Sequence, residues 1–135
     1  MRGGLFTDDA GRSYLLIHGS PRAPPLDEYL FPPWLPEGEF RAVLSYIRQD
    51  DLLVGHTHVP MLKLIDGRRI INPRRVGQPR DGDPRAAYAI IDTEKEPPEN
   101  VEFHRVEYDV DSAAERIMKA GGLPEFLARR LYEGY

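Results

Sequence analysis

Three of the four histidines follow short apolar segments, where imidazole side chains are placed to bind a metal ion. His18 comes directly after residues 15–17, and His56 and His58 come after residues 52–54 and a glycine. In open α/β sheets, ligands bind beyond the carboxyl ends of the strands, so neighbouring strands would bring these rings to one edge. Neutral imidazole is the commonest protein metal ligand, and nitrogen ligands suit a transition metal better than calcium. The pattern therefore predicts a metal centre formed by these three histidines.

Each histidine also has a simpler interpretation. A single histidine after a strand is usually a polar cap or a hydrogen-bonded residue at the edge of the core, so His18 by itself predicts no metal. The His-x-His spacing places both rings on the same side only where the backbone is extended. Spacing alone therefore leaves both interpretations of His56 and His58 open. The fourth histidine, His104, lies in the alternating segment 101–108 and is predicted to face outward from a strand.

Composition limits the class of protein. The 135 residues predict a single domain, 1–135, with 41% apolar and 30% charged residues, as in a globular protein. The net charge of −4, from 18 basic and 22 acidic residues, gives no indication of a nucleic-acid binding surface. No apolar segment approaches the roughly 20 residues that a membrane helix needs. The absence of cysteine excludes disulfides and thiolate metal sites, and we expect a cytoplasmic protein.

The elements that must position the histidines follow from hydrophobic periodicity. Apolar residues at positions 40, 43, 44 and 47 predict a helix over 39–49 between buried strands at 14–17 and 52–54, and Asp66-Gly67 predicts a hairpin turn. The further predicted elements are strands at 61–65, 69–71, 86–92 and 101–108, and helices from Ser112 to Gly121 and from Pro124 to about Tyr132. The proline-rich segment 21–36 is predicted to be an irregular loop packed by aromatic residues. The expected class is mixed α/β (α+β).

A second candidate segment, residues 72–85, lies between the predicted hairpin and the later strands. It holds four arginines, two glycines and three prolines, so it is a rigid cationic loop. Next to a metal ion, arginine could bind phosphate oxygens through two parallel hydrogen bonds. Alternatively, the arginines of a surface loop would pair with Asp81 and Asp83. The segment by itself favours this second interpretation.

Taken together, the motifs resemble a known family. They are His-Gly-Ser-Pro at 18–21, Gly-His-Thr-His at 55–58, Asn-Pro at 72–73, and Val-Gly-Gln-Pro-Arg-Asp-Gly-Asp-Pro at 76–84. In this order they closely resemble the C-terminal half of the calcineurin-like metallophosphoesterases, in the small prokaryotic branch described as phosphodiesterase-like or diadenosine tetraphosphatase-like. The resemblance covers nearly the whole chain. It implies half of a four-layer α-β-β-α sandwich with C-terminal helices.

The resemblance also implies roles for individual residues. His18 and His56 would bind one divalent metal ion, and His58 would bind a neighbouring ion, with manganese, iron or zinc as candidates. A metal-activated hydroxide would attack the phosphorus of a phosphate ester substrate. Asn72, Arg80 and Arg85 would contact that substrate.

Two departures from the family pattern affect this interpretation. The Asp-x-His, Gly-Asp and Gly-Asn-His motifs of the family's first half are absent, so the bridging aspartate and the general acid are missing from this chain. Arg74 and Arg75 stand where the family commonly has Gly-Ser. We therefore expect half of a dinuclear site, inactive alone and completed by a missing N-terminal half or by self-association through exposed apolar surface.

Three functions follow, in this order. The first is hydrolysis of a phosphodiester or phosphomonoester once the missing half is supplied. The second is a protein-binding scaffold, because some relatives of this fold have lost catalysis. The third is a nonfunctional remnant of the same fold.

Overall fold

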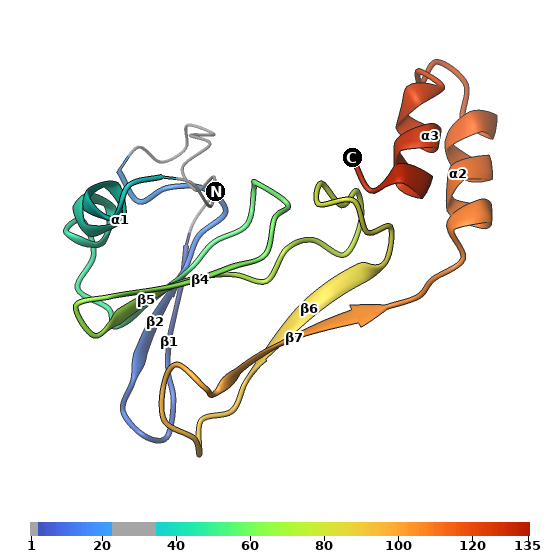
Figure 1. The fold of residues 1–135 in the computed structure, drawn as a ribbon. Coiled ribbons are helices and arrows are strands. Elements are labelled where there is room, and N and C mark those ends of the chain that lie inside the picture. The colour runs from blue at the N-terminus through green and yellow to red at the C-terminus, as the bar shows by residue number, and fades with distance from the viewer. Residues whose placement is uncertain (1–2, 23–34) are drawn as a thin grey trace.

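The computed structural model describes residues 3–22 and 35–135, which form seven strands and three helices (Figure 1). The predicted loop 21–36 therefore lies mostly outside the described residues. In chain order, the elements are β1 (Gly4–Thr7), β2 (Ser13–Leu16), α1 (Glu37–Leu44), β3 (Asp51–Leu53), β4 (Met61–Ile65), β5 (Arg68–Asn72), β6 (Ala86–Ile91), β7 (Val101–Val106), α2 (Val110–Lys119) and α3 (Phe126–Glu133). Within these residues, no helix is long and apolar enough to cross a membrane.

The first five strands form one mixed sheet in the order β1-β2-β3-β5-β4. The three central strands, β2, β3 and β5, are parallel, and an antiparallel strand lies at each edge. Strands β4 and β5 form the predicted hairpin around Asp66 and Gly67, both of which have positive φ, 51° and 78°. A two-residue turn that matches the twist of a hairpin requires positive φ at both positions, which explains this sequence.

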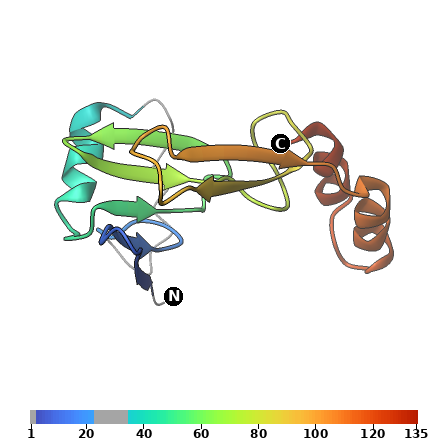
Figure 2. The ribbon, with the colours of Figure 1, turned by 90° about the horizontal axis from the view of Figure 1, so that it is seen from below.

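Helix α1 covers one face of this sheet, and the β6–β7 hairpin lies on the other side (Figures 1 and 2). The apolar residues that predicted the helix all lie in the core, where Phe40 and Val43 are almost completely buried together with Leu52 and Ile70. The helix ends at Leu44, five residues earlier than predicted. The guanidinium of Arg68 donates to the carbonyls of Leu44, Ile47 and Gln49, so a side chain distant in sequence holds the chain after the helix.

A buried cluster of charged residues joins the layers. Asp51 and Arg69 are both fully buried, and Asp51 accepts two hydrogen bonds from Arg12, each 2.8 Å long, as well as bonds from Arg69. Arg69 also donates to the side chain of Asn100, which precedes β7. Burial raises the pKa of Asp51, but the bonds from Arg12 and Arg69 outweigh it, so the pKa lies below its ordinary value of 3.8. Asp51 is therefore a buried carboxylate that needs both guanidinium partners.

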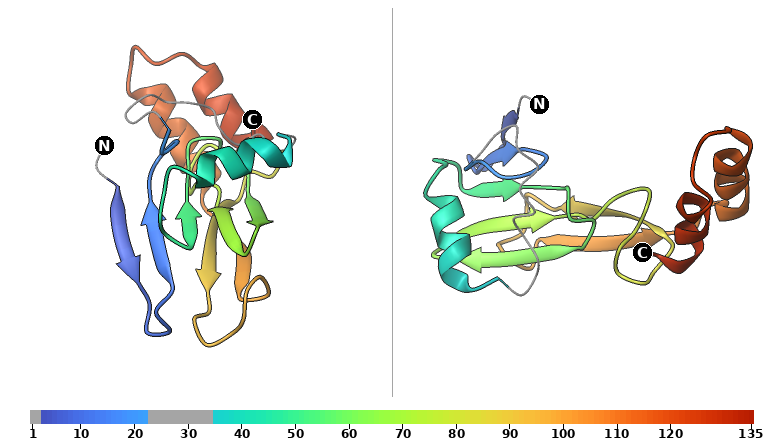
Figure 3. Two further views of the ribbon diagram at one scale, coloured as in Figure 1. Left: turned by 90° about the vertical axis from the view of Figure 1, so that its left-hand side faces the viewer. Right: turned by 90° about the horizontal axis from the view of Figure 1, so that it is seen from above.

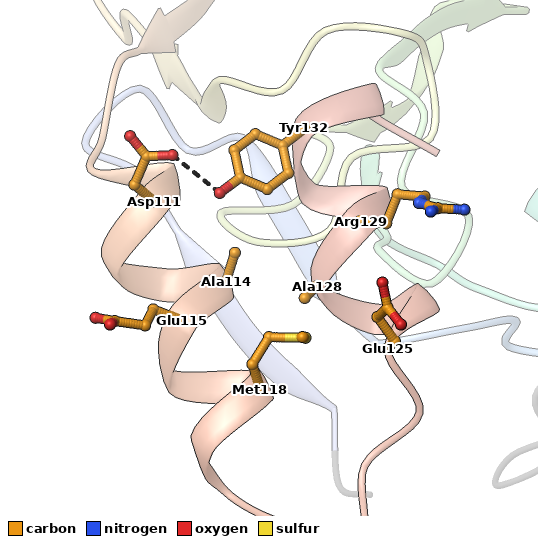
Figure 4. A pocket seen from close by; sticks show the side chains of 8 residues that line it. All are labelled: Asp111, Ala114, Glu115, Met118, Glu125, Ala128, Arg129 and Tyr132. Atoms are coloured by element: carbon orange, nitrogen blue, oxygen red, sulfur yellow. Dashed lines mark hydrogen bonds between the residues drawn. The ribbon is translucent and has the colours of Figure 1, made fainter.

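The C-terminal helices α2 and α3 pack on each other beyond the end of the β6–β7 hairpin, away from α1 (Figure 3). Ala114, Ala128 and Leu131 form their small apolar contact. A groove between the two helices is lined by Met118 and Tyr132 among others, and Tyr132 donates to Asp111 at 2.9 Å (Figure 4). Helix α2 begins at Val110, ahead of the predicted Ser112, because the carboxylate of Asp109 accepts from the Ser112 amide and caps the helix.

The class expected from the sequence, a mixed α/β fold, is confirmed. Strand β1 was not predicted, because it has four residues and all of them are exposed. His104 lies opposite Tyr88 in the β6–β7 register, and the two rings stack with their centroids 5.0 Å apart. Tyr88 is 45% exposed, so this face of the hairpin is open to solvent, as predicted for His104.

Candidate metal centre

The ends of two parallel strands bring His18 next to the Gly-His-Thr-His segment. Strands β2 and β3 are aligned so that Leu16 faces Leu53, and the chain leaves both strands at the same edge of the sheet. The carbonyl of His18 then accepts from the amide of Gly55 at 3.0 Å. A Cβ atom built at Gly55 would lie 3.5 Å from Nδ1 of His18, an ordinary van der Waals contact, so the two segments lie side by side here. The predicted convergence at the sheet edge is confirmed for these two segments.

His18 and His56 form a close pair. Nε2 of His18 lies 3.3 Å from Nδ1 of His56, and the rings meet edge to face with their centroids 5.2 Å apart. Two nitrogens bound to one tetrahedral ion at about 2.0–2.1 Å are roughly 3.3 Å from each other. The separation of the two ring nitrogens therefore fits a shared transition-metal ion. Their assignment as ligands stays a prediction that this geometry favours.

The backbone at both histidines of the Gly-His-Thr-His segment is left-handed. The φ angles of His56 and His58 are 66° and 62°, so the segment is not extended and the simple same-side rule does not apply to it. A residue with a side chain in this region typically costs about 1–2 kcal/mol. Such conformations persist where surrounding contacts hold them, and they concentrate at functional sites.

Asn72 supplies those contacts. Its side chain is fully buried at the end of β5, and its amide nitrogen donates to the carbonyl of Gly55 at 2.9 Å and to the hydroxyl of Thr57 at 2.8 Å. Its oxygen accepts from the amide of Arg74 at 2.9 Å. Asn72 is thus a positioning residue that ties the histidine segment to the cationic loop. The predicted contact of Asn72 with a substrate stays a prediction.

His58 contacts the cationic loop rather than His18. Its Nδ1 lies 2.8 Å from the carbonyl of Gln78, and its Nε2 lies 2.6 Å from a guanidinium nitrogen of Arg75. Because a carbonyl only accepts, Nδ1 carries the proton and Nε2 carries the lone pair. Burial lowers the pKa of His58, and the charges of Arg75 and Arg80 lower it further, so this imidazole is neutral at pH 7. A neutral imidazole is the form that binds metal ions.

The four arginines of the loop divide into two pairs. Arg74 is buried and binds the Asp81 carboxylate and the Asp83 carbonyl, and the exposed Arg85 binds the Asp83 carboxylate at 2.7 Å. These two contacts match the interpretation in which the arginines pair with aspartates. Arg75 and Arg80, in contrast, lie close enough to His58 to affect its pKa. The predicted substrate contacts of Arg80 and Arg85 stay predictions, with Arg85 held on Asp83.

Two partners of His58 were missed by the sequence analysis. The contact from Gln78 is made by its backbone carbonyl, so no residue type signals it. Arg75 did carry a signal, because it replaces a small residue of the family pattern, but the sequence could not show which of the adjacent arginines faces the site.

No third ligand joins the pair of His18 and His56 in the described part of the chain. Among residues 3–22 and 35–135, no three histidine, aspartate or glutamate side chains converge closely enough to hold a metal ion. If His18 and His56 bind one ion, as predicted, further ligands are needed to complete its coordination.

The C-terminal helix supports the loop that contacts His58. The amide of Gly82 donates to the carbonyl of Gly134 at 3.0 Å. Gly134 has a φ of 72°, and a Cβ atom there would lie 2.6 Å from the amide nitrogen of Asp83. With its amide oriented to accept, Gln78 also binds Arg130 of α3, whose Nε lies 3.0 Å from the side-chain oxygen. The end of α3 therefore packs directly on the loop.

Comparisons with known proteins identify a family and solved structures that this chain is similar to. A model of the calcineurin-like phosphoesterase superfamily domain matches residues 5–96. An uncharacterized protein of Methanocaldococcus jannaschii, MJ0912, is 36% identical over 139 residues, which cover 92% of this chain and 53% of that protein. A metallophosphoesterase structure from Sphaerobacter thermophilus matches with 34% identity and a TM-score of 0.76, over 97% of this chain and 58% of that one.

A second structure, hypothetical protein PH1004 from Pyrococcus horikoshii OT3, matches with 25% identity and a TM-score of 0.82. The match covers 98% of this chain and 50% of that chain. The chain therefore spans about half the length of the relatives that it matches.

Proposed function

Because this chain belongs to the calcineurin-like phosphoesterase superfamily, we propose that it supplies the histidine ligands of a metal-dependent phosphoesterase site. The observation that carries the proposal is the pair formed by His18 and His56, whose ring nitrogens are 3.3 Å apart at the end of two parallel strands. The family supports metal-dependent phosphoesterase chemistry in general. Hydrolysis of a phosphodiester or a phosphomonoester by this particular site is the finer proposal.

Calcineurin-like phosphoesterases use divalent metal ions. Imidazole ligands suit iron or zinc, and manganese is a candidate through the family resemblance. When bound, such an ion polarises a phosphoryl oxygen and lowers the pKa of water, which supplies the nucleophile. His18 and His56 would hold one ion, and the neutral imidazole of His58 would serve a neighbouring ion. Arg80, whose charge acts on His58, would stabilise the negative charge that develops on the phosphoryl oxygens.

We further propose that this chain provides only part of the coordination. Two histidines cannot neutralise a dinuclear centre, and the described residues form no group of three histidine, aspartate or glutamate side chains that could hold a metal ion. The relatives are about twice as long as the matched region, so other polypeptide in them can contribute ligands. The remaining ligands would come from such a segment or from a second copy, and we expect the 135 residues alone to be inactive.

Metal binding is the first test. Isothermal titration with Mn²⁺ and Zn²⁺ should show binding that is lost in His56→Ala and retained in His104→Ala. His104 is the matched control, because it lies on the open face of the β6–β7 hairpin and stacks on Tyr88. Equal binding by both variants, or no binding by the wild-type protein, would overturn the proposed metal centre.

Hydrolysis is the second test. We expect a generic aryl phosphodiester in the presence of Mn²⁺ to be turned over no faster by the wild-type chain than by His56→Ala. Turnover that disappears only in His56→Ala would show that the chain completes an active site by itself. That outcome would retain the phosphoesterase and reject the incomplete site.

One observation favours a second candidate function. The lone pair of His58 accepts from Arg75 at 2.6 Å, and this contact satisfies the histidine without a metal ion. A protein-binding scaffold that has lost catalysis would keep such a contact permanently. The titration distinguishes the two functions, because a scaffold of this kind should bind neither metal through its histidines.

A further inference from the structure

The contact between Arg75 and His58 occupies the one ring nitrogen of His58 that could bind a metal ion. Nδ1 of His58 is committed to the carbonyl of Gln78 at 2.8 Å, so Nε2 is the only position from which this ring can bind a metal ion. That same nitrogen lies 2.6 Å from the guanidinium of Arg75. One lone pair cannot accept from a guanidinium and coordinate an ion at the same time.

Arg75 is weakly held in its contact with His58. Its side chain is exposed, and no ion pair with a carboxylate is found for it within residues 3–22 and 35–135. Its neighbour Arg74 differs in burial and in bonding, because it is buried and bound to Asp81 and to the carbonyl of Asp83. Arg74 therefore holds the loop in place. The guanidinium of Arg75, in contrast, can exchange its contact with His58 for contacts with water.

We propose that Arg75 competes with the metal ion for Nε2 of His58, so that loading of this histidine releases a guanidinium at the edge of the site. This inference rests on the proposed metal centre and adds a substrate-binding residue to it. A released guanidinium beside the ion is placed to bind the oxygens of a phosphoryl group through two hydrogen bonds. Arg75 would then contact two unesterified oxygens of a phosphoryl group, which phosphomonoesters and phosphodiesters both supply.

The test uses the whole chain and the nitrogen signal of His58 Nε2 in an NMR titration with Zn²⁺ alone. Arg75→Met removes the donor and the charge but keeps an unbranched apolar side chain, and Arg75→Gln keeps a donor without the charge. Arg85→Met is the matched control, since Arg85 is an exposed arginine of the same loop that binds Asp83 instead. Before zinc is added, only the Arg75 variants should shift the His58 signal.

We expect Arg75→Met to load His58 at a zinc concentration about two- to tenfold lower than wild type, the range for one net hydrogen bond. Arg75→Gln should lie between them, and Arg85→Met should match wild type. An unchanged zinc concentration for half-loading of His58 in Arg75→Met would overturn the inference. So would a His58 signal that, before zinc is added, is the same in wild type and in the Arg75 variants. A response to zinc at His56 alone would reject the inference but keep the metal centre, whereas no response at any histidine would reject both.

Discussion

Asn72 connects the strand that ends beside the site to the segment that carries His56 and His58. Its buried side-chain nitrogen donates to the carbonyl of Gly55 and to the hydroxyl of Thr57, and its side-chain oxygen accepts from the backbone amide of Arg74. These bonds stabilise backbone that is left-handed at both histidines and therefore unfavourable by itself. The chemistry of the imidazoles thus depends on a residue that contacts neither ring.

We expect Asn72→Ala to lower the free energy of unfolding by about 1–3 kcal/mol, because it leaves buried polar groups without partners. It should also weaken metal binding, since the histidine segment loses its support. Thr57→Val is the control, because it removes one partner of Asn72 and leaves the other, so its cost should be smaller. Denaturant unfolding and zinc titration measure both effects. Equal losses in the two variants would contradict the positioning role.

Asp51 makes stability depend on pH at the residue scale. Its folded pKa lies below 3.8, so its contribution is present above that value and is lost as the pH falls through the folded pKa. Asp51→Asn leaves Arg69 buried without a counter-charge, which typically costs about 3–5 kcal/mol. The difference in unfolding free energy between wild type and variant should therefore be large at pH 7 and narrow below about pH 4. The exposed Asp9→Asn should show no such difference, and a gap independent of pH would contradict the assignment.

Helix α3 and the cationic loop behave as one unit at the element scale. The loop contacts His58 through Gln78 and Arg75. The same loop also binds Gly134 and Arg130 at the end of the helix. The packing is close enough to exclude a methyl group at Gly134. A helix remote in sequence from the histidines therefore fixes the loop that orients one of them.

Gly134→Ala tests this packing against a glycine with a similar backbone. Gly121 has a φ of 67°, and a Cβ atom there would meet no neighbour within 4 Å, whereas Gly134 has a φ of 72° and its Cβ would meet Asp83 at 2.6 Å. Both alanines incur the left-handed backbone, but only Gly134→Ala adds overpacking, worth about 1–3 kcal/mol. Thermal unfolding and hydrogen exchange of the Gly82 amide should show the larger effect in Gly134→Ala. Indistinguishable variants would mean that the helix does not support the loop.

At the scale of the whole molecule, much apolar surface is uncovered. The edge strand β1 exposes Leu5 by 72% and Phe6 by 58%, and the open face of the β6–β7 hairpin exposes Tyr88 and Ile90. β1 pairs only with β2 in the described part of the sheet, so its other edge is available to another strand. An apolar edge strand is a site of association unless it is covered.

Self-association through β1 is therefore expected to weaken in Leu5→Lys, because a charged side chain on an edge strand opposes pairing. Val76→Lys is the matched control, since Val76 is 73% exposed but lies in the cationic loop. Sedimentation velocity over a range of concentrations should show association of wild type and of Val76→Lys, and less of it for Leu5→Lys. A wild-type protein that is monomeric at every concentration would contradict the expectation.

The sequence by itself determined the elements and the approximate place of the site. Hydrophobic spacing identified α1 and the buried strands, Asp66-Gly67 identified the hairpin, and the positions of His18 and His56 after two strands identified their meeting point. These features follow from interactions between near neighbours in the chain, which is why local patterns report them. Hydrophobic patterns did not predict strand β1, because its residues are exposed. Its strand conformation comes from pairing with β2.

Only the tertiary structure decided what each side chain near the site does. It assigned Asn72 to the backbone of the histidine segment, Arg75 to His58 and Arg85 to Asp83, although the arginines are equivalent by residue type. It also brought Gly134 against the loop. These roles depend on contacts between residues that are distant in sequence and on φ angles that such contacts impose. Spacing and composition do not encode them, because the same residue types at the same spacing allow several pairings.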